Sequence, residues 1–498
     1  MIILRAKLPI FYSALLLTGV NLLLRFVGTS FQVFLSARIG AEGIGLLQLV
    51  LSVASMSMVA GTAGIRTATM YLTAEELGRS RPGNVHWVLS GCVLYSLLCS
   101  FAVAVGVMIF APYLAETWIG NIQTLDSIRL FAVFLPVNCL SGVMVGYFTG
   151  ANRIGTLAAV EVAEQLCSMV CTISLLILWA GNNAAKCCQA VVMGSGMGAC
   201  LTLLCLMLLR LRERNRVSPR IPVARRLSNV AIPLALADDL KTGINTIENL
   251  MVPKRLSLFA GAVSPLAAFG MVSGMVFPIL MFPACILYGL AELLIPELAR
   301  CNAAGSQKRI SYLVHRSLKA AMLYGLLFCG LEFLLAEKLC IGLYGNHQAG
   351  VQLKQYALLI PMLYCDAITD AMTKGLGQQK ICVRYNILTS VLDVIFLYLL
   401  LPKYGMTGYF ISFAVTHFLN FILSLRLLLK ITGEHIPFHI PVLSLTGMFA
   451  AMRITSHLNT VMAQVILYPA VLLCLLYLLG IICRSDVTWL RGLIKKSK

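Results

Sequence analysis

The stretch that decides the fold is PIFYSALLLTGVNLLLRFVGTSFQVF, residues 9–34, which is followed by SARIGAEGIGLLQLV at residues 36–50. The first run is apolar and long enough to cross the hydrocarbon core of a bilayer. Asn21 and Arg25 lie in its middle, and their spacing of four residues puts them on one helix face. An arginine at this depth costs about 3 kcal/mol on insertion scales, so such residues face a protein interior or a water-filled path. We therefore expect this face to line a functional cavity.

The composition is typical of polytopic α-helical membrane proteins. Of the 498 residues, 59% are hydrophobic and 12% are charged, and the mean hydropathy is +0.87. The first run is too long to be a cleaved signal peptide, and it carries Arg25. Apolar runs of roughly 20 residues recur along the chain, and each is long enough to span a membrane. We predict about 14 transmembrane helices, at 9–34, 44–65, 87–112, 127–149, 156–180, 188–209, 229–252, 267–290, 318–342, 351–373, 382–401, 407–429, 438–456 and 461–483.

The net charge of +19 follows from basic loops rather than from nucleic-acid binding. Lysine and arginine gather in alternate connections, which predicts a multi-pass membrane protein with both termini cytoplasmic. The longest basic connection is RLRERNRVSPRIPVARRLSN, residues 210–229. It is interpreted as a linker that touches anionic lipid, and a regulatory role is the alternative. Aromatic residues do not alternate with the basic ones, so no nucleic-acid partner is predicted.

Residues that could bind metal or catalyse a reaction follow no known pattern. The 17 cysteines are scattered, many of them in apolar runs, and the seven histidines lack ligand spacing. The chain has no nucleotide-binding glycine loop and no hydrolase or transferase motif. We therefore predict that the protein is not an enzyme and holds no metal or cofactor. Movement of any substrate across the membrane would then be driven by a gradient, with Na⁺ or H⁺ as the candidate coupling ion.

An internal repeat relates FLPVNCLSGVMVGYFTGANRI, residues 134–154, to LIPMLYCDAITDAMTKGLGQQKI, residues 359–381. The segments Pro136–Gly150 and Pro361–Gly375 have the same spacing and fall at the same place in two sets of six spans. This indicates parallel repeats related about the membrane normal. The predicted organisation is an N-lobe at 1–210, a basic cytoplasmic linker at 211–228, a C-lobe at 229–430, and two further spans with a basic cytoplasmic tail at 431–498.

Polar stripes on several apolar spans predict a hydrated cavity between two bundles. The candidate substrate and cavity residues are Arg25, Asn21, Arg66, Glu161, Glu164, Asp238, Lys241, Asn245, Glu248, Asp366, Asp370 and Asp393. Simpler roles stay open for some of them. Asp238 and Lys241, three residues apart, can neutralise each other. Glu164 and Asp370 can pair with cations across the bundle, and polar residues such as Asn386 can join helices by hydrogen bonds.

Several stretches together resemble a known group of transporters. They are RIGAEGIGLLQL at 38–49, TAGIRTATMYLTAEE at 62–76, GYFTGANRI at 146–154 and IENLMVPKRL at 247–256. In this order they resemble the polysaccharide-transporter branch, which includes stage V sporulation protein B, of the multidrug/oligosaccharidyl-lipid/polysaccharide exporter superfamily. The resemblance implies 14 helices with two six-helix lobes around a central cavity. It also implies that the cations Arg25 and Arg66 suit a diphosphate head group.

The function implied is a flippase that moves a lipid-linked oligosaccharide or peptidoglycan precursor by alternating access, in spore cortex or envelope polysaccharide synthesis. Its expected partners are the lipid-linked saccharide, membrane lipids and cell-envelope synthases. Lipid II flippases of the superfamily carry a charged cluster in the eighth span, which MVSGMVFPILMF at 271–282 lacks. The alternative is a Na⁺- or H⁺-coupled multidrug antiporter that uses Glu161, Glu164, Asp366 and Asp370. A scaffold or a saccharide polymerase is disfavoured, because the predicted outside connections are short.

Overall fold

The computed structural model describes residues 2–79, 81–181, 183–212, 222–261, 264–434, 439–457 and 460–482. Every regular element within these ranges is helical. The chain divides into two compact units. Unit 1 comprises Met1–Gly274 and Ser390–Tyr409, and unit 2 comprises Met275–Thr389 and Phe410–Lys498. Half of the predicted linker, 213–221, and the basic tail, 483–498, lie outside the described residues.

The helices that begin in unit 1 are α1 (Ile2–Thr62), α2 (Ile65–Gly78), α3 (Val85–Tyr113), α4 (Leu125–Gly150), α5 (Ile154–Leu175), α6 (Ala184–Leu211), α7 (Ala224–Leu256) and α8 (Pro265–Met271). Those that begin in unit 2 are α9 (Phe277–Met281), α10 (Ala284–Ala303), α11 (Gln307–Tyr344), α12 (His347–Ala357), α13 (Ile360–Gly375), α14 (Gln379–Thr432), α15 (His439–Thr455) and α16 (Val461–Leu478). Short π-helical turns extend α3, α5 and α8, at Leu114–Ile119, Leu176–Ala180 and Val272–Val276.

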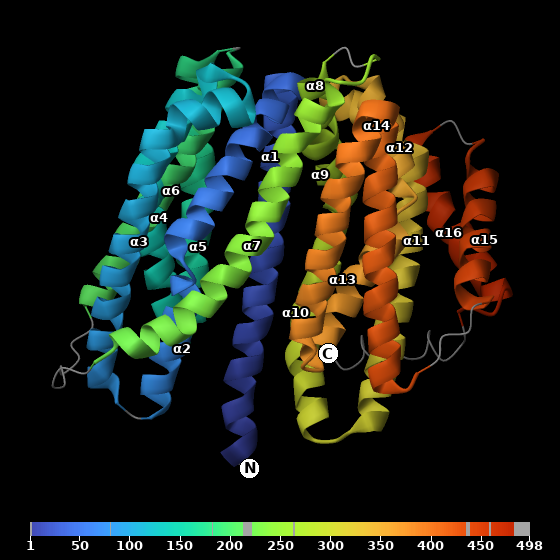
Figure 1. Ribbon diagram of the computed structural model, residues 1–498. Coiled ribbons are helices and arrows are strands. Elements are labelled where there is room, and N and C mark those ends of the chain that lie inside the picture. Colours follow the sequence, from blue (N-terminus) through green and yellow to red (C-terminus); the bar gives the residue numbers. More distant parts are fainter. Residues whose placement is uncertain are drawn as a thin grey trace. The chain divides into compact units, whose positions relative to one another are not determined.

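Helix α1 is broken at Gly40, where the chain reverses its direction (Figure 1). Gly40 has a φ of 79°, which lies in the left-handed region that glycine adopts without steric cost. The two halves of α1 correspond to the first two predicted spans, 9–34 and 44–65. The sequence predicts a glycine-rich connection between these spans, and the structure reduces it to a break at one residue.

Helix α14 contains a second break of this kind, at Gly405, with a φ of 57° and a ψ of −137°. The chain folds back sharply there. As a result, a Cβ atom on Gly408 would lie 2.6 Å from the carbonyl oxygen of Leu400. The break separates the predicted spans at 382–401 and 407–429. Glycine thus marks the boundary between two spans in both of the longest helices.

Seven helices among the described residues are long and apolar enough to cross a membrane, or up to eight if the bent pair Pro265–Met281 and Ala284–Ala303 counts as one span. The predicted count of about 14 therefore stays a prediction. Two features explain part of the difference. Helices α1 and α14 each contain two predicted spans, and α7 carries Asp238, Asp239 and Lys241 close together in its middle.

The predicted repeat is visible in how two glycines pack, each within its own unit. In unit 1, a Cβ atom on Gly150, at the end of α4, would lie 2.5 Å from the carbonyl oxygen of Met70 in α2. In unit 2, a Cβ atom on Gly375, at the end of α13, would lie 2.9 Å from the carbonyl oxygen of Ile295 in α10. Helix α2 follows the second predicted span, 44–65, and α10 continues past the end of the eighth, 267–290, so the two contacts occupy equivalent positions in the two sets of six. The same backbone contact is therefore made once in each repeat.

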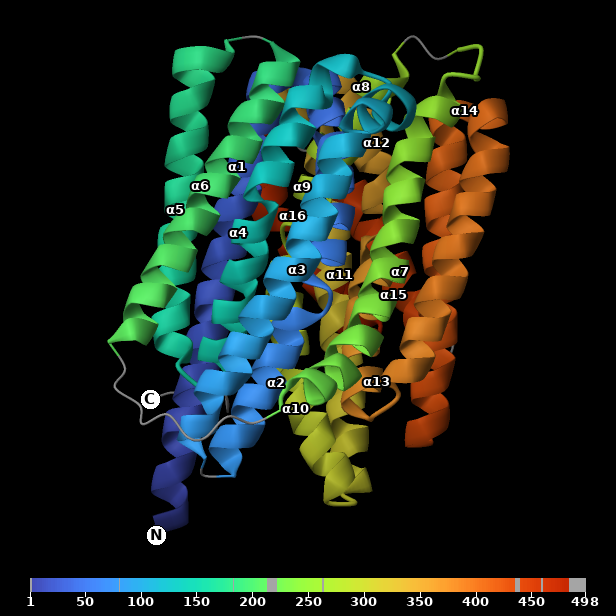
Figure 2. The ribbon, with the colours of Figure 1, turned by 60° about the vertical axis from the view of Figure 1, so that its left-hand side comes forward.

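Helices α5 and α6 of unit 1 lie side by side (Figure 2). A Cβ atom on Gly198 of α6 would lie 3.2 Å from the carbonyl oxygen of Glu164 in α5, and one on Gly194 would lie 3.0 Å from the backbone nitrogen of Thr172. Small residues allow this close approach, as is common between membrane helices. The packing brings the polar stripe of α5 against α6.

Candidate functional site

Arg66 and Glu161 form the first pair of predicted site residues that the structure brings together. Their Nη2 and Oε1 atoms are 4.0 Å apart, and the side chains are 61% and 24% exposed. Arg66 lies in the first turn of α2, directly after a break at Ala63 and Gly64, which both have a positive φ. The break starts a new helix, and the Arg66 side chain near its beginning reaches Glu161 of α5.

Arg25 lies at the same level along the helices as Glu161 of this pair. A Cβ atom on Gly28, which shares a helix face with Arg25, would lie 3.7 Å from Nε2 of Gln165 in α5. The first half of α1 and α5 run in the same direction (Figure 2). One turn back from this contact, Arg25 and Glu161 are therefore at the same level. Arg25 is exposed, and an arginine within a predicted span faces protein or water rather than lipid.

Glu164 is held by a hydroxyl group rather than by a cation. Its Oε2 accepts a hydrogen bond of 2.6 Å from Oγ1 of Thr202 in α6. Thr202 is 1% exposed, so the bond is shielded from water. The alternative in which Glu164 pairs with a cation across the bundle is not what the structure shows. Glu164 joins two helices, while Glu161, one turn earlier, faces Arg66.

The predicted residues of α7 divide between two surroundings. Asp238, Lys241 and Asn245 are exposed, and Asp238 and Lys241 form no ion pair with each other among the described side chains. The other face of α7 is bonded to the second half of α1. Thr246 donates a hydrogen bond of 3.1 Å to the carbonyl oxygen of Ser52.

Glu248 of α7 meets Asp393 of α14, and both residues lie in unit 1. Their carboxyl groups lie close to each other, and Asp393 is only 5% exposed. Two neighbouring carboxylates repel each other, and a proton or a cation between them relieves this repulsion. The sequence predicted both residues but not that they meet.

The two candidates of unit 2 are satisfied within that unit. Asp366 accepts a hydrogen bond of 3.1 Å from Nδ2 of Asn420 in α14. Asp370 forms an ion pair of 2.5 Å with Lys374, one turn later on α13, and not with a cation on another helix. Asn420 was missed, although it is a single amide in the apolar run that follows Gly405. The side chain of Asn21 lies outside the described side chains.

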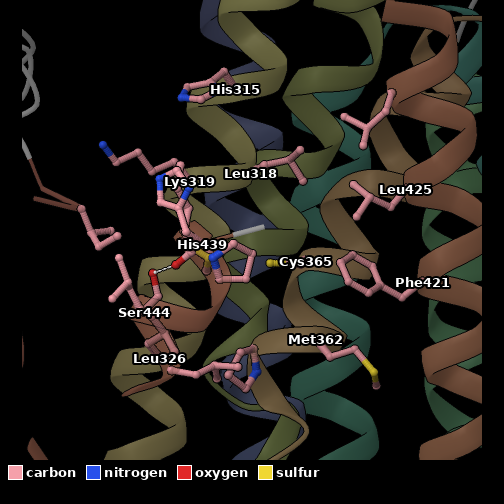
Figure 3. A pocket seen from close by; sticks show the side chains of 18 of the residues that line it. His315, Leu318, Lys319, Leu326, Met362, Cys365, Phe421, Leu425, His439 and Ser444 are labelled. Carbon is pink, nitrogen blue, oxygen red and sulfur yellow. Dashed lines mark hydrogen bonds between the residues drawn. The ribbon is translucent and has the colours of Figure 1, made fainter. Parts of the chain in front are cut away.

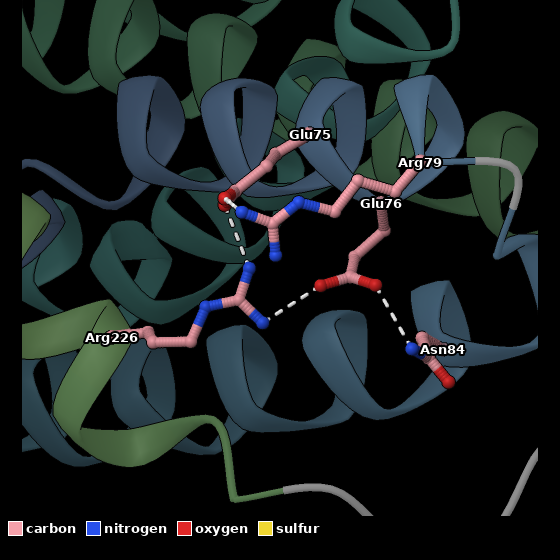
Figure 4. A network of polar contacts seen from close by, with 5 residues as sticks. All are labelled: Glu75, Glu76, Arg79, Asn84 and Arg226. Carbon is pink, nitrogen blue, oxygen red and sulfur yellow. Dashed lines mark hydrogen bonds and ion pairs between the residues drawn. The ribbon is translucent and has the colours of Figure 1, made fainter.

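A polar network that the sequence did not predict joins α2 to the start of α7 (Figure 4). Arg226 donates hydrogen bonds of 2.7 Å to Oε1 of Glu76 and 2.7 Å to Oε2 of Glu75. Glu76 is 1% exposed and also accepts 2.9 Å from Nδ2 of Asn84, while Glu75 pairs with Arg79 at 2.6 Å. Arg226 belongs to the segment interpreted as a linker touching lipid, but the structure uses it as an ion-pair partner in the first turn of α7.

Glu332 of α11, to which the sequence assigned no role, is deeply buried in unit 2. It is 5% exposed, and neither carboxyl oxygen has a hydrogen-bond partner among the described atoms. Its surroundings include Tyr324, Cys329 and Tyr364, none of which is a cation. Burying an unpaired carboxylate is costly, so the packing suits a neutral carboxyl group.

Comparison with known proteins identifies the family. Residues 11–264, just over half of the chain, match the family described as polysaccharide biosynthesis protein. This chain belongs to that family. A curated relative, stage V sporulation protein B of Bacillus subtilis (strain 168), is 22% identical over 424 residues, which are 81% of this chain and 80% of that protein. The resemblance stated from the sequence is confirmed.

Solved structures of similar fold are transporters of the same superfamily. An inward-facing multidrug resistance MATE transporter has a TM-score of 0.68 at 14% identity, covering 84% of this chain and 98% of its own. The lipid II flippase MurJ has a TM-score of 0.67 at 14% identity, covering 96% and 100%. At this identity the likeness establishes the fold. It confirms the predicted fold class, an all-α multi-pass membrane protein.

Proposed function

We propose that this member of the polysaccharide biosynthesis protein family is a flippase for a lipid-linked oligosaccharide or peptidoglycan precursor. The observation that carries the proposal is the placement of Arg25, within the first predicted span, at the level of the Arg66–Glu161 pair. Two guanidinium groups there suit the diphosphate of a lipid-linked sugar, because charge-assisted hydrogen bonds replace the hydration of its oxygens. Glu161 would keep Arg66 oriented when no substrate is bound.

The names of relatives support this choice of substrate. MurJ is a lipid II flippase by name, and the curated relative is a sporulation protein. The proposed setting is accordingly the bacterial cytoplasmic membrane, in spore cortex or envelope polysaccharide synthesis, with both termini cytoplasmic. Cell-envelope synthases would supply the substrate on one side and use it on the other. In this proposal the protein moves its substrate by alternating access and catalyses no bond change.

We further infer that the coupling ion, H⁺ or Na⁺, binds at the Glu248–Asp393 pair. The two carboxyl groups lie close to each other and Asp393 is buried, so a proton or a Na⁺ ion between them would relieve their repulsion. Alternating access requires the ion to bind one state more tightly than the other. A contact between α7 and α14 can supply this difference if the helices separate in the other state.

The test is a leaflet-accessibility assay with a labelled lipid-linked sugar, in vesicles that contain only this protein. Arg25→Ala and Arg66→Ala should each abolish flipping, and Arg129→Ala, an exposed arginine of α4, serves as the matched control. Wild-type flipping by well-inserted Arg25→Ala protein would refute the proposed role. Asp393→Asn should remove the dependence on a Na⁺ or H⁺ gradient, whereas Asp238→Asn on the exposed face of α7 should not.

The multidrug antiporter is the second candidate, since a MATE transporter has a comparable TM-score. It predicts drug efflux that depends on Na⁺ or H⁺ and is lost when Asp366 or Asp370 is neutralised. In the structure these carboxylates are occupied by Asn420 and Lys374. Efflux from the same vesicles, with no flipping of the lipid-linked sugar, would favour this candidate over the flippase.

A further inference from the structure

A cavity in unit 2 does not select a ligand by charge. It has a volume of about 700 Å³, and its lining comes mainly from α11, α13, α14 and α15 (Figure 3). Lys319 and Glu434 both contribute to this lining, so an occupant would meet both signs of charge. The chain directly before Arg66, in unit 1, is more informative, because it constrains where a cation of the proposed site stands.

Ala63 and Gly64 form a break between α1 and α2 in the left-handed backbone conformation. Their φ angles are 44° and 70°. Glycine adopts such angles without steric cost, but the Cβ atom of alanine lies too close to the backbone. A residue with a side chain keeps this conformation only where its surroundings hold it. The break is therefore a strained connection, and Arg66 follows two residues after Gly64.

Contacts from two other helices hold the chain at this break. The hydroxyl of Tyr95 in α3 donates a hydrogen bond of 3.4 Å to the carbonyl oxygen of Ala63. One residue earlier, Oγ1 of Thr62 lies 3.7 Å from Sγ of Cys139 in α4. Both contacts act on the end of α1, before Arg66 enters the next helix.

The backbone of Arg66 itself packs against α4. A Cβ atom on Gly146 would lie 2.4 Å from the carbonyl oxygen of Arg66, so the two helices approach each other through a glycine. This contact holds the start of α2 in place. The freedom that Arg66 retains relative to α1 therefore lies in the two residues of the break.

We propose that Tyr95 is a positioning residue for the anionic substrate, because its hydroxyl holds the break at Ala63 and the break places the guanidinium group of Arg66. This inference rests on the proposed function, which assigns Arg66 to the diphosphate. The Arg66–Glu161 contact is 4.0 Å long and the Arg66 side chain is 61% exposed. That pair is too long for a direct hydrogen bond, so it does not fix the guanidinium group alone.

Two other side chains lie near the Tyr95 hydroxyl. Cys99 is one turn later on α3, and Asp239 belongs to α7. Oδ1 of Asp239 is buried and has no hydrogen-bond partner among the described atoms, so it is the competing acceptor. A hydroxyl that turned from Ala63 to Asp239 would release the break.

The first measurement follows the break and needs no substrate. Amide hydrogen exchange of the full-length protein in detergent is read by mass spectrometry in peptides covering residues 59–69. The amides of Ala63 and Ala68 donate hydrogen bonds on either side of the break. Tyr95→Phe, which removes only the hydroxyl, should raise exchange there by about fivefold. Tyr71→Phe, at an exposed tyrosine of α2, is the matched control and should leave exchange unchanged.

The second measurement is the Kd for undecaprenyl diphosphate in detergent micelles. Tyr95→Phe should weaken binding by about fivefold, and it should have no further effect in protein that carries Arg66→Ala. Ala63→Gly accepts the positive φ without strain. It should therefore restore most of the affinity lost in Tyr95→Phe, a rescue that a general loss of packing would not allow.

Unchanged exchange at the break in Tyr95→Phe would overturn the proposal. Equal weakening of binding with and without Arg66 would also overturn it, since the hydroxyl would then act elsewhere. If Asp239→Asn reproduces both effects of Tyr95→Phe, the hydroxyl acts through Asp239 and not through Ala63. Failure of the proposed function has a different signature: Arg66→Ala then binds the diphosphate like the wild type, and Tyr95 loses its substrate role even where exchange shows that it holds the break.

Discussion

Replacement of Arg226 by alanine should destabilise the contact between α2 and α7. The carboxylate of Glu76 is 1% exposed and would keep only Asn84 as a donor. Breaking a buried ion pair costs about 3–5 kcal/mol, but the Arg226 side chain is 35% exposed. Solvent screening reduces the expected loss to about 2 kcal/mol. Glu75 contributes less, because it keeps its partner Arg79.

A double-mutant cycle measures this coupling. The free energy of unfolding is determined in detergent for Arg226→Ala, Glu76→Gln and the double variant, and then for the same cycle with Glu75→Gln. We expect a coupling energy of about 2 kcal/mol for Glu76 and under about 1 kcal/mol for Glu75. Arg226→Lys should recover only part of the loss, because an ammonium group cannot bridge both carboxylates with the planar fork of arginine. Equal coupling for the two glutamates, or coupling under about 0.5 kcal/mol for Glu76, would refute the reasoning.

Other variants test packing and burial within each unit, with the thermal midpoint as the measurement. Glu332→Gln should change stability by under about 1 kcal/mol, because the packing around Glu332 suits a neutral group. Glu332→Lys should prevent folding by burying a charge. A large loss in Glu332→Gln would reveal an ionised partner. Gly150→Ala and Gly375→Ala should each cost about 1–3 kcal/mol through overpacking against a backbone, whereas Gly155→Ala, which meets open space, should not destabilise α5. Thr202→Val should cost about 1–3 kcal/mol, because Glu164 loses its donor, and an unchanged midpoint would contradict this.

Much of the fold follows from patterns that lie close together in the sequence. The glycines at 40 and 405 mark chain reversals because each stands between apolar runs of membrane length. The repeated segments that end at Gly150 and Gly375 are likewise recognised from local sequence. In the structure each of these glycines packs against the backbone of a neighbouring helix. The predicted polar stripe of α5 is also present in the structure, where Glu161 and Glu164 face neighbouring helices.

The partners within the site could not be predicted, because they depend on which helices become neighbours. Glu248 and Asp393 lie far apart in the sequence, and nothing in either segment indicates that the two carboxyl groups become neighbours. Arg226 looks like one more basic loop residue until Glu75 and Glu76 are seen opposite it. Glu332 shows a similar limit: hydropathy gives its depth in the membrane, but its lack of hydrogen-bond partners depends on the packing around it.

The reversal at Gly40 has a consequence for biogenesis. With almost no loop between its halves, α1 can leave the translocon as a helical hairpin rather than as two separate segments. The insertion cost of Arg25 is about 3 kcal/mol on an isolated span. In a hairpin this cost is offset by transferring the apolar surface of both halves into the bilayer. A side chain at position 40 would strain the reversal and leave the arginine-bearing half to enter the bilayer alone.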